Sequence, residues 1–456
     1  MACEDGCHLD CEGHVRRDML KVGVLGLFGL GLHDLFWMKQ AQAEMAAAEK
    51  VSAAKEGRAP VKAAPSDGSA DQVILIWTAG GMSHIDTLDP KPEAPDNIRG
   101  GYRAIATKAP GMQLAEPFVN LAKVAGDVCL IRSMTTNEGA HERGTHYMMT
   151  GFPPLPGFGV PSYGSVVAKL MTKRGALPPY IAVPSPVLYG GAGFLGAALD
   201  PFSPGGDPGQ AGFRVRDLQP EGNLTFERVD RRRTLREAVD ASFKQYEASS
   251  DAARTVDQFY QAAYGVISST EARAAFDLTK EPAAMRERYG RDSFGQSLLL
   301  SRRLIEAGVR FVTVQNGGWD MHQQVMRNMA GKLPALDRSL AALLGDLKER
   351  GLLQRTVVLM MGEFGRTPHI NENAGRDHYP TVFSLLAAGG GFQGGVVVGA
   401  SDKQGTEVAD RPVTPPDLSA TLYSCLGLDY STELHSPAGI RILLSRGGTP
   451  ISEALA

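Results

Sequence analysis

Cysteine is scarce in this chain of 456 residues, which contains only 5. Three of them, Cys3, Cys7 and Cys11, crowd the N-terminus, and only Cys129 and Cys425 lie in the rest of the sequence. No C-x-x-C pair occurs, which argues against a site built on paired thiols. Both later cysteines stand in apolar surroundings, so we expect two buried thiols; the sequence leaves open whether they pair.

Long apolar runs are absent as well. The run Val22–Leu32 has about half the ~20 residues that a membrane-spanning helix needs, so the sequence predicts no stable membrane span in the mature chain. A short apolar core instead suits a signal peptide. RRDMLK precedes it at residues 16–21, and AQA at 41–43 supplies small residues for cleavage after Ala43.

The paired arginines resemble a twin-arginine signal. That resemblance implies transport of an already folded protein by the twin-arginine export machinery to the periplasm or cell envelope. The alternative is an amphipathic N-terminal helix, which four glycines between residues 23 and 31 would weaken. We therefore predict a signal peptide at 1–43 and, from its composition, a linker at 44–70.

An excess of charge of one sign is also missing. The net charge is -3, and no basic face with interleaved aromatic residues occurs, so the sequence indicates no nucleic-acid partner. An arginine-rich stretch at 228–236 is interrupted by Asp230 and followed by Glu237, which favours a solvated, ion-paired face over an anion site.

Several catalytic motifs are missing: there is no G-x-S-x-G elbow, no P-loop and no H-E-x-x-H. Two G-x-G-x-x-G matches occur, at 191–196 and 389–394. The first is soon followed by Pro201 and the second leads into a run of valines. Neither opens a helix, as phosphate binding requires, so both are interpreted as turns.

Short runs typical of buried strands alternate with helical patterns from Asp71 onward. The helical patterns cover 294–307, 333–350 and a segment opened by Thr414, while the strand-like runs cover 73–77, 128–131, 309–314, 357–361, 382–386 and 396–398. This alternation predicts an α/β domain at 71–456, with a mainly parallel sheet and helices on both faces. We also expect a helical insertion at about 224–290 and a long irregular loop at 184–215.

Histidine is concentrated where the predicted strands end. The chain has 10 histidines, three of them in the predicted signal peptide. Six of the other seven fall in four loops that follow strands: His84, His141, His146, His322, His369 and His378. The carboxyl ends of parallel strands meet at one edge of a sheet, which is where α/β proteins place their sites. Imidazoles beside carboxylates suit a divalent transition metal, zinc or manganese, in one or two ions.

The best candidate ligand pairs are Asp320 with His322 and Asp377 with His378. The alternative is that these residues only hydrogen-bond the loops to one another.

Several stretches together resemble a known family. They are GMSHIDTLDPKP at 81–92, TG at 150–151, EAGVR at 306–310, WDMH at 319–322, GEFGRTP at 362–368 and GRDH at 375–378. In them the chain resembles the domain-of-unknown-function 1501 family, exported sulfatase-like proteins of the alkaline-phosphatase superfamily. The resemblance implies an alkaline-phosphatase/sulfatase-like α/β fold with a strand-end metal site. It places one metal's ligands at Asp320, His322 and His378, and a residue of a second metal site at Glu363.

The sequence also departs from the superfamily pattern. A metal-binding aspartate is replaced by Gly80, so His84 or Asp86 would have to substitute for it. The sulfatase motif C-x-P-x-R is missing, and His141 stands in its place, so no cysteine can become formylglycine.

We therefore predict a metal-dependent hydrolase of sulfate or phosphate esters, acting on a small anionic ester or a sulfated or phosphorylated glycan. Asp320, His322, His378, Asp377 and Asp86 are the candidate metal ligands. His141, as acid/base or nucleophile, and Glu363 are the candidate catalytic residues; Arg366, Arg376 and His84 are the candidates for binding the substrate. One alternative is a catalytically inactive binding or scaffold protein; another is a mutase or transferase.

Overall fold

A seven-stranded sheet forms the centre of the computed structural model, which describes residues 68–215 and 269–456. The strand order is β11-β4-β10-β7-β1-β6-β5. The bounds are β1 Gln72–Trp77, β4 Val128–Met134, β5 Tyr180–Val183, β6 Phe311–Gln315, β7 Thr356–Met361, β10 Phe383–Ala388 and β11 Val396–Val398. Only β10 runs antiparallel to its neighbours, so the predicted mainly parallel sheet is confirmed.

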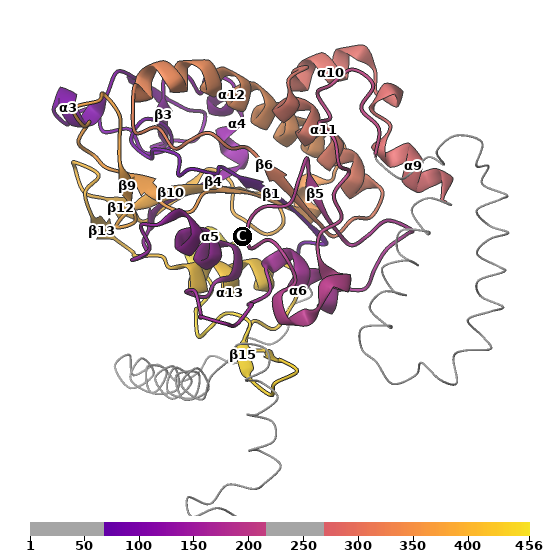
Figure 1. Cartoon of the computed structure of the whole chain (residues 1–456). Helices are drawn as coiled ribbons and strands as arrows, with labels where there is room; N and C mark the ends of the chain where they lie inside the picture. The colour runs from indigo at the N-terminus through magenta and orange to yellow at the C-terminus, as the bar shows by residue number, and fades with distance from the viewer. Residues whose placement is uncertain (1–67, 216–268) are drawn as a thin grey trace, which may run out of the picture. The chain divides into compact units, whose positions relative to one another are not determined.

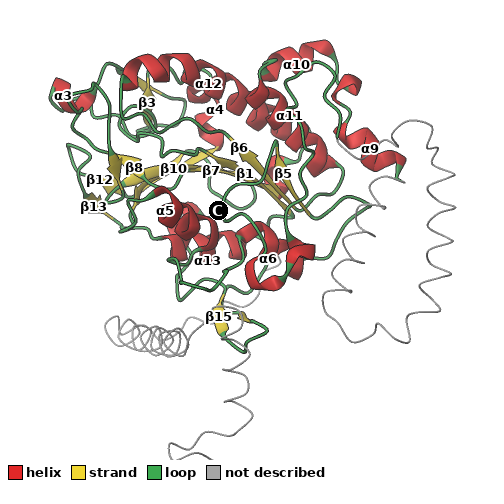
Figure 2. Cartoon of the chain, in the orientation of Figure 1, coloured by secondary structure: helices red, strands yellow, loops and turns green. Residues whose placement is uncertain are grey.

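Helices cover both faces of the sheet, as Figures 1 and 2 show. One layer holds α4 Leu121–Val124, α9 Thr270–Phe276, α10 Ala283–Tyr289, α11 Ser293–Glu306 and α12 Val325–Glu349; the other holds α5 His141–Thr150, α6 Tyr163–Leu170 and α13 Pro415–Cys425. Along β1, Ile74 and Ile76 join the first core while Val73, Leu75 and Trp77 join the second. This alternation of buried side chains explains why the strand sequences are apolar throughout.

Smaller elements surround these layers. A short helix, α3, covers Asp96–Arg99. Four two-stranded ribbons pair β2 Ala104–Ala106 with β3 Gln113–Ala115, β8 Gly365–Arg366 with β9 His378–Tyr379, β12 Ala400–Ser401 with β13 Val408–Asp410, and β14 Glu433–His435 with β15 Arg441–Leu443. In the described part of the chain, no helix has the length and apolar character required to span a membrane.

Two local expectations differ from the structure. The strand β5 lies at a sheet edge and was not predicted, because YIAV at 180–183 is short and follows two prolines. Helix α12 begins at Val325, not at Leu333, and continues through Pro334. By contrast, Thr414 and Asp417 form the predicted capping box of α13.

The predicted signal peptide, nearly all of the linker and residues 216–268 of the expected insertion lie outside the described residues. Cys129 and Cys425 are free and buried, and burial raises the pKa of each thiol to about 12.

A buried ion-pair network joins the helices of the first layer. Arg302 on α11 is 1% exposed and pairs with Glu281 at 2.7 Å, with Asp346 of α12 at 3.0 Å and with Glu306 at 2.6 Å. Tyr289 of α10 donates a hydrogen bond to the same Asp346 carboxylate. The network therefore ties the C-terminal part of α11, which leads into the start of β6, to the C-terminal part of α12.

Replacing Arg302 should destabilise the fold strongly. Arg302→Met removes the arginine that Glu281 and Asp346 share and leaves each buried carboxylate with one arginine, Arg303 or Arg350. Since breaking a buried pair completely costs about 3–5 kcal/mol, we expect a loss of up to about that size in free energy of unfolding. The exposed pair Arg291–Glu287 provides the control, since Arg291→Met should cost less than about 1 kcal/mol. Urea unfolding followed by circular dichroism measures the free energy of unfolding of both variants. Equal losses would contradict the larger contribution assigned to the buried Arg302 network.

Candidate functional site

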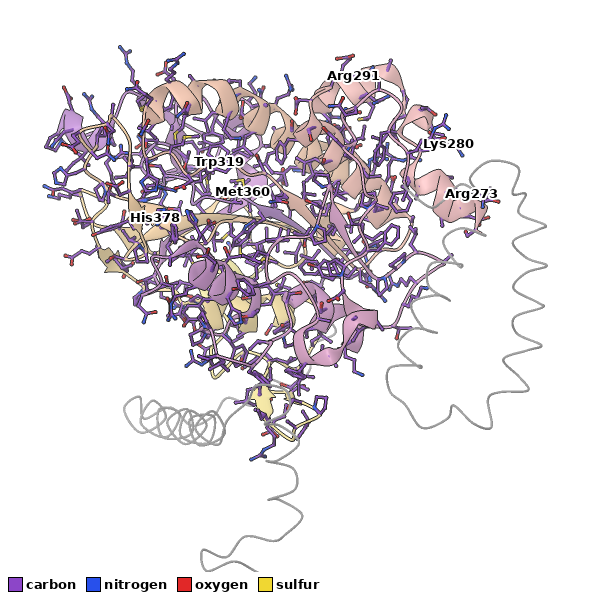
Figure 3. All side chains as sticks on the ribbon, in the orientation of Figure 1. Arg273, Lys280, Arg291, Trp319, Met360 and His378 are labelled. Atoms are coloured by element: carbon purple, nitrogen blue, oxygen red, sulfur yellow. The ribbon has the colours of Figure 1, made fainter. Side chains whose placement is uncertain are left out.

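The candidate site lies where loops from different parts of the sheet meet. Asp320 and His322 follow β6, Glu363 follows β7, and His141 is the first residue of α5, which comes after β4. The chain then leaves and returns as the β8–β9 ribbon, in which Arg366 pairs with His378. Figure 3 marks His378 near the end of the sheet, to the left of Met360 on β7.

Three donor atoms converge with spacings typical of metal ligands. His322 Nε2 lies 2.9 Å from Asp320 Oδ1 and 3.0 Å from His378 Nε2, and His378 Nε2 lies 3.2 Å from Asp320 Oδ1. Ligand atoms about 2.0–2.2 Å from one ion would be separated by about 3.3–3.6 Å at tetrahedral angles and by about 3 Å at octahedral angles. The structure thus brings together the ligand set expected at Asp320, His322 and His378.

His141 approaches the same carboxylate from the other oxygen. Its Nε2 is 3.3 Å from Asp320 Oδ2, and the ligand atoms of His141, Asp320 and His378 all lie within 4.8 Å of one another. The shorter spacings around Oδ1 favour His322 over His141 as the third ligand. His141 is nevertheless close enough to act at the same centre.

Each of the three imidazoles has its Nδ1 fixed by an acceptor. His378 Nδ1 is 2.9 Å from the carbonyl oxygen of Gly139, His322 Nδ1 is 2.6 Å from Asp377 Oδ1, and His141 Nδ1 is 2.7 Å from Glu363 Oε1. A carbonyl or carboxylate oxygen can only accept, so Nδ1 carries the proton in each ring. In the neutral imidazole, Nε2 then presents a lone pair.

These lone pairs face the Asp320 carboxylate, which also offers only lone pairs. Burial lowers the pKa of His378, which favours the neutral ring. The hydrogen bond from His322 lowers the pKa of Asp377, so that carboxylate stays ionised as an acceptor. Acceptors at this separation repel one another unless a proton or a cation lies between them. The donor set therefore fits a divalent metal ion.

Glu363 forms a buried pair with His141. Its side chain is 3% exposed, and Oε1 accepts from His141 and from the backbone N–H of Gly80 at 2.8 Å. Its second oxygen is buried and has no hydrogen-bond partner among the described residues. A carboxylate that orients an imidazole in this way is the arrangement of a general base and its positioning partner.

Arg366 is placed to act on Asp320 and not on a substrate. It is 1% exposed, donates to the carbonyl oxygens of Gly81 and Arg376 at 2.9 Å each, and also bonds Gly80 O and Asp320 Oδ1. Although burial alone would raise the pKa of Asp320, the hydrogen bond and charge of Arg366 hold it well below the usual carboxyl range. We therefore assign Arg366 a positioning role in place of the expected substrate contact.

Asp86 and Arg376 bind each other and do not join the cluster. Both are fully buried, with Arg376 Nε 2.7 Å from Asp86 Oδ2, and Ser83 donates to the same oxygen at 2.6 Å. His84 is also buried, with Nε2 3.1 Å from the carbonyl oxygen of Gly405, and burial lowers its pKa to about 4. His84 Nδ1 is buried and has no hydrogen-bond partner among the described residues. The structure therefore does not bring Asp86, Arg376 or His84 to the metal-binding and substrate-binding positions expected from the sequence.

Other residues of the site were not recognised in the sequence. The buried ring of Phe364 packs 4.5 Å from that of His378 and 5.1 Å from that of His141, centroid to centroid. Asn371 donates to Asp377 Oδ1 at 3.2 Å and to His322 O at 3.1 Å. The one feature of the sequence that could have indicated them is their position inside the GEFGRTPHIN stretch. An apolar ring and an amide have no chemistry of their own that marks them as site residues. His146 and His369 lie outside the cluster and contact Phe152 O and Asn97 instead.

Comparison with solved structures finds similar chains at low identity. A sulfatase from Pseudoalteromonas sp., PsFucS1, is 15% identical with a TM-score of 0.35, over 85% of this chain and 72% of that one. An alkaline phosphatase superfamily protein from Vibrio parahaemolyticus is 11% identical with a TM-score of 0.34, over 86% and 72%. The alkaline phosphatase of the Antarctic bacterium TAB5 is 11% identical with a TM-score of 0.35, over 73% and 95%.

No curated protein matches the chain. One family model does, described as a protein of unknown function, DUF1501, and the match runs over residues 70–455. Because this match covers the great majority of the sequence, the chain belongs to the DUF1501 family.

Proposed function

We propose that this chain is an exported, metal-dependent hydrolase of sulfate or phosphate esters. The observation that carries the proposal is the convergence of Asp320 Oδ1 with the Nε2 atoms of His322 and His378, each ring fixed through its Nδ1. The three side chains are between 25% and 44% exposed, so an ester in solution can reach them.

Asp320, His322 and His378 would hold one divalent ion, with zinc or manganese the best fit to two imidazoles and a carboxylate. A bound ion of this kind supplies Lewis acidity toward an ester oxygen and lowers the pKa of a water molecule. Asp377 and Gly139 keep the two imidazoles in the tautomer that offers Nε2.

His141 would move the proton in this reaction. Its Nδ1 is held by Glu363, so Nε2 is the atom that takes a proton from water or returns one to the leaving oxygen. The two cysteines of the described chain are buried thiols away from this cluster, so a formylglycine nucleophile is not part of the proposal.

Export through the twin-arginine machinery to the periplasm or cell envelope, and a sulfated or phosphorylated glycan as substrate, remain parts of the proposal. The first rests on the sequence at 16–43, and the second on the need for an anionic ester.

A catalytically inactive binding or scaffold protein is the second candidate. The observation in its favour is Gly80, which contributes no side chain at the end of the central strand β1. The hydrolase and the scaffold protein differ in whether an ester is turned over and not in whether a metal is bound.

Metal analysis tests the ligand set. His322→Ala and His378→Ala should each reduce bound zinc or manganese to background, because two remaining donors hold an ion poorly. The control is His369→Ala, which removes an exposed imidazole of the same loop whose Nδ1 lies 3.2 Å from Asn97 Nδ2, and it should leave the metal content unchanged. Chelation should lower the melting temperature of the wild type but not that of His378→Ala. Equal metal content in all variants would refute the site.

The role of His141 is tested by separating binding from turnover. His141→Gln should keep the metal, while kcat on p-nitrophenyl sulfate or phosphate falls by about 10²–10⁴-fold, the usual contribution of a general acid–base. Glu142→Gln, at the neighbouring exposed position, should change neither. Loss of the metal in His141→Gln would make His141 a ligand, and absence of turnover in the metal-loaded wild type would favour the scaffold.

A further inference from the structure

The end of strand β1 offers backbone to the site and no side chain. Gly80 has φ +107, and a Cβ atom there would lie 2.4 Å from the backbone nitrogen of Asp320. The loops after β1 and β6 therefore touch at a distance that only glycine allows. Gly80 gives its N–H to Glu363 and its carbonyl oxygen to Arg366. No carboxylate can be added at this position without moving the Asp320 loop.

The guanidinium of Arg366 fills a cage of oxygen atoms at this point. Its donors reach three carbonyl oxygens, those of Gly80, Gly81 and Arg376, and Oδ1 of Asp320. Carbonyl and carboxylate oxygens are the ligands that hard divalent cations take. Arg366 is 1% exposed and permanently charged, so the cage already contains a positive charge that cannot leave.

We infer that the site holds a single divalent ion and that Arg366 supplies a fixed positive charge in place of a second ion. The site consequently selects monoanionic esters. This inference rests on the proposed function for its last step only, since the number of ions bound does not depend on turnover.

The selectivity follows from the balance of charge. The carboxylates that contact the cluster are Asp320, Glu363 and Asp377, and Arg366 offsets one of them. One divalent ion balances the two charges that remain, so the loaded site is neutral. A second ion would leave it strongly positive. A neutral site has no net positive charge to offset a second negative charge on the substrate. It therefore suits a sulfate ester or a phosphate diester, which carries one negative charge, better than a phosphate monoester, which carries nearly two at pH 8.

Calorimetric titration with zinc and with manganese, checked by elemental analysis, tests the number of ions. The wild type should bind one ion per chain in the cluster; two would overturn the inference. Arg366→Gln removes the charge and opens the oxygen cage, so a second binding event should appear that is absent from the wild type and from Arg366→Lys. Arg366→Gln that folds as the wild type does and binds no second ion would equally contradict the assignment.

Substrate preference tests the charge argument separately. With the metal-loaded wild type at pH 8, kcat/KM on p-nitrophenyl sulfate or bis(p-nitrophenyl) phosphate should exceed that on p-nitrophenyl phosphate by at least about tenfold, equivalent to one charge pair in a partly solvated site. A preference for the dianionic monoester would overturn the selectivity. Binding of one ion with no turnover of any of the three esters would instead refute the proposed hydrolase function and leave the ion count standing.

Discussion

Repulsion between acceptor atoms is the constraint on which the site depends. Asp320 offers two carboxylate oxygens, and the Nε2 atoms of His141, His322 and His378 all lie within 3.3 Å of one or the other. In the tautomers set by their Nδ1 partners, none of these nitrogens can donate to the carboxylate. Arg366 supplies one positive charge from the buried side. A cation on the open side would satisfy all the lone pairs together.

The fold maintains this unfavourable arrangement by anchoring every member at its far end. Gly139, Asp377 and Glu363 hold the imidazoles, Phe364 packs against two of the rings, and the three backbone carbonyls around Arg366 hold the guanidinium. These anchors hold the donor atoms together without an ion, so the cluster is preorganised. The buried pair Asp86–Arg376 contributes by joining the loop after β1 to the returning ribbon.

The sequence predicts the sheet and the identity of the cluster better than the role of each charge in it. Apolar runs such as 73–77 and 357–361 are strands because both faces of the sheet are covered, and this pattern is visible locally. The direction of β10 and the short edge strand β5 depend on partners distant in sequence. Arg366 and Arg376 look alike in the sequence as anion-binding groups; only the three-dimensional structure shows that their donors are already taken by Asp320, Asp86 and backbone carbonyls.

The difference between the identity of a residue and its contacts also determines how the departures from the sulfatase pattern are interpreted. Gly80 in place of a carboxylate looks in the sequence like the loss of a ligand, as an inactive relative would show. In the structure, the position has no room for a side chain, and the space beside it is filled by an arginine whose charge is directed at Asp320. His141 likewise stands where a nucleophile is missing, yet it is paired with a buried carboxylate and lies 3.3 Å from the Asp320 carboxylate. A site that had lost its function would lose such partners one at a time. Each loss would leave a buried charge without a partner, which lowers the stability of the fold considerably. Apart from one oxygen of Glu363 and Nε2 of His141, the polar groups of this cluster have partners, so the cluster does not show the scattered unpaired charges that such losses would leave.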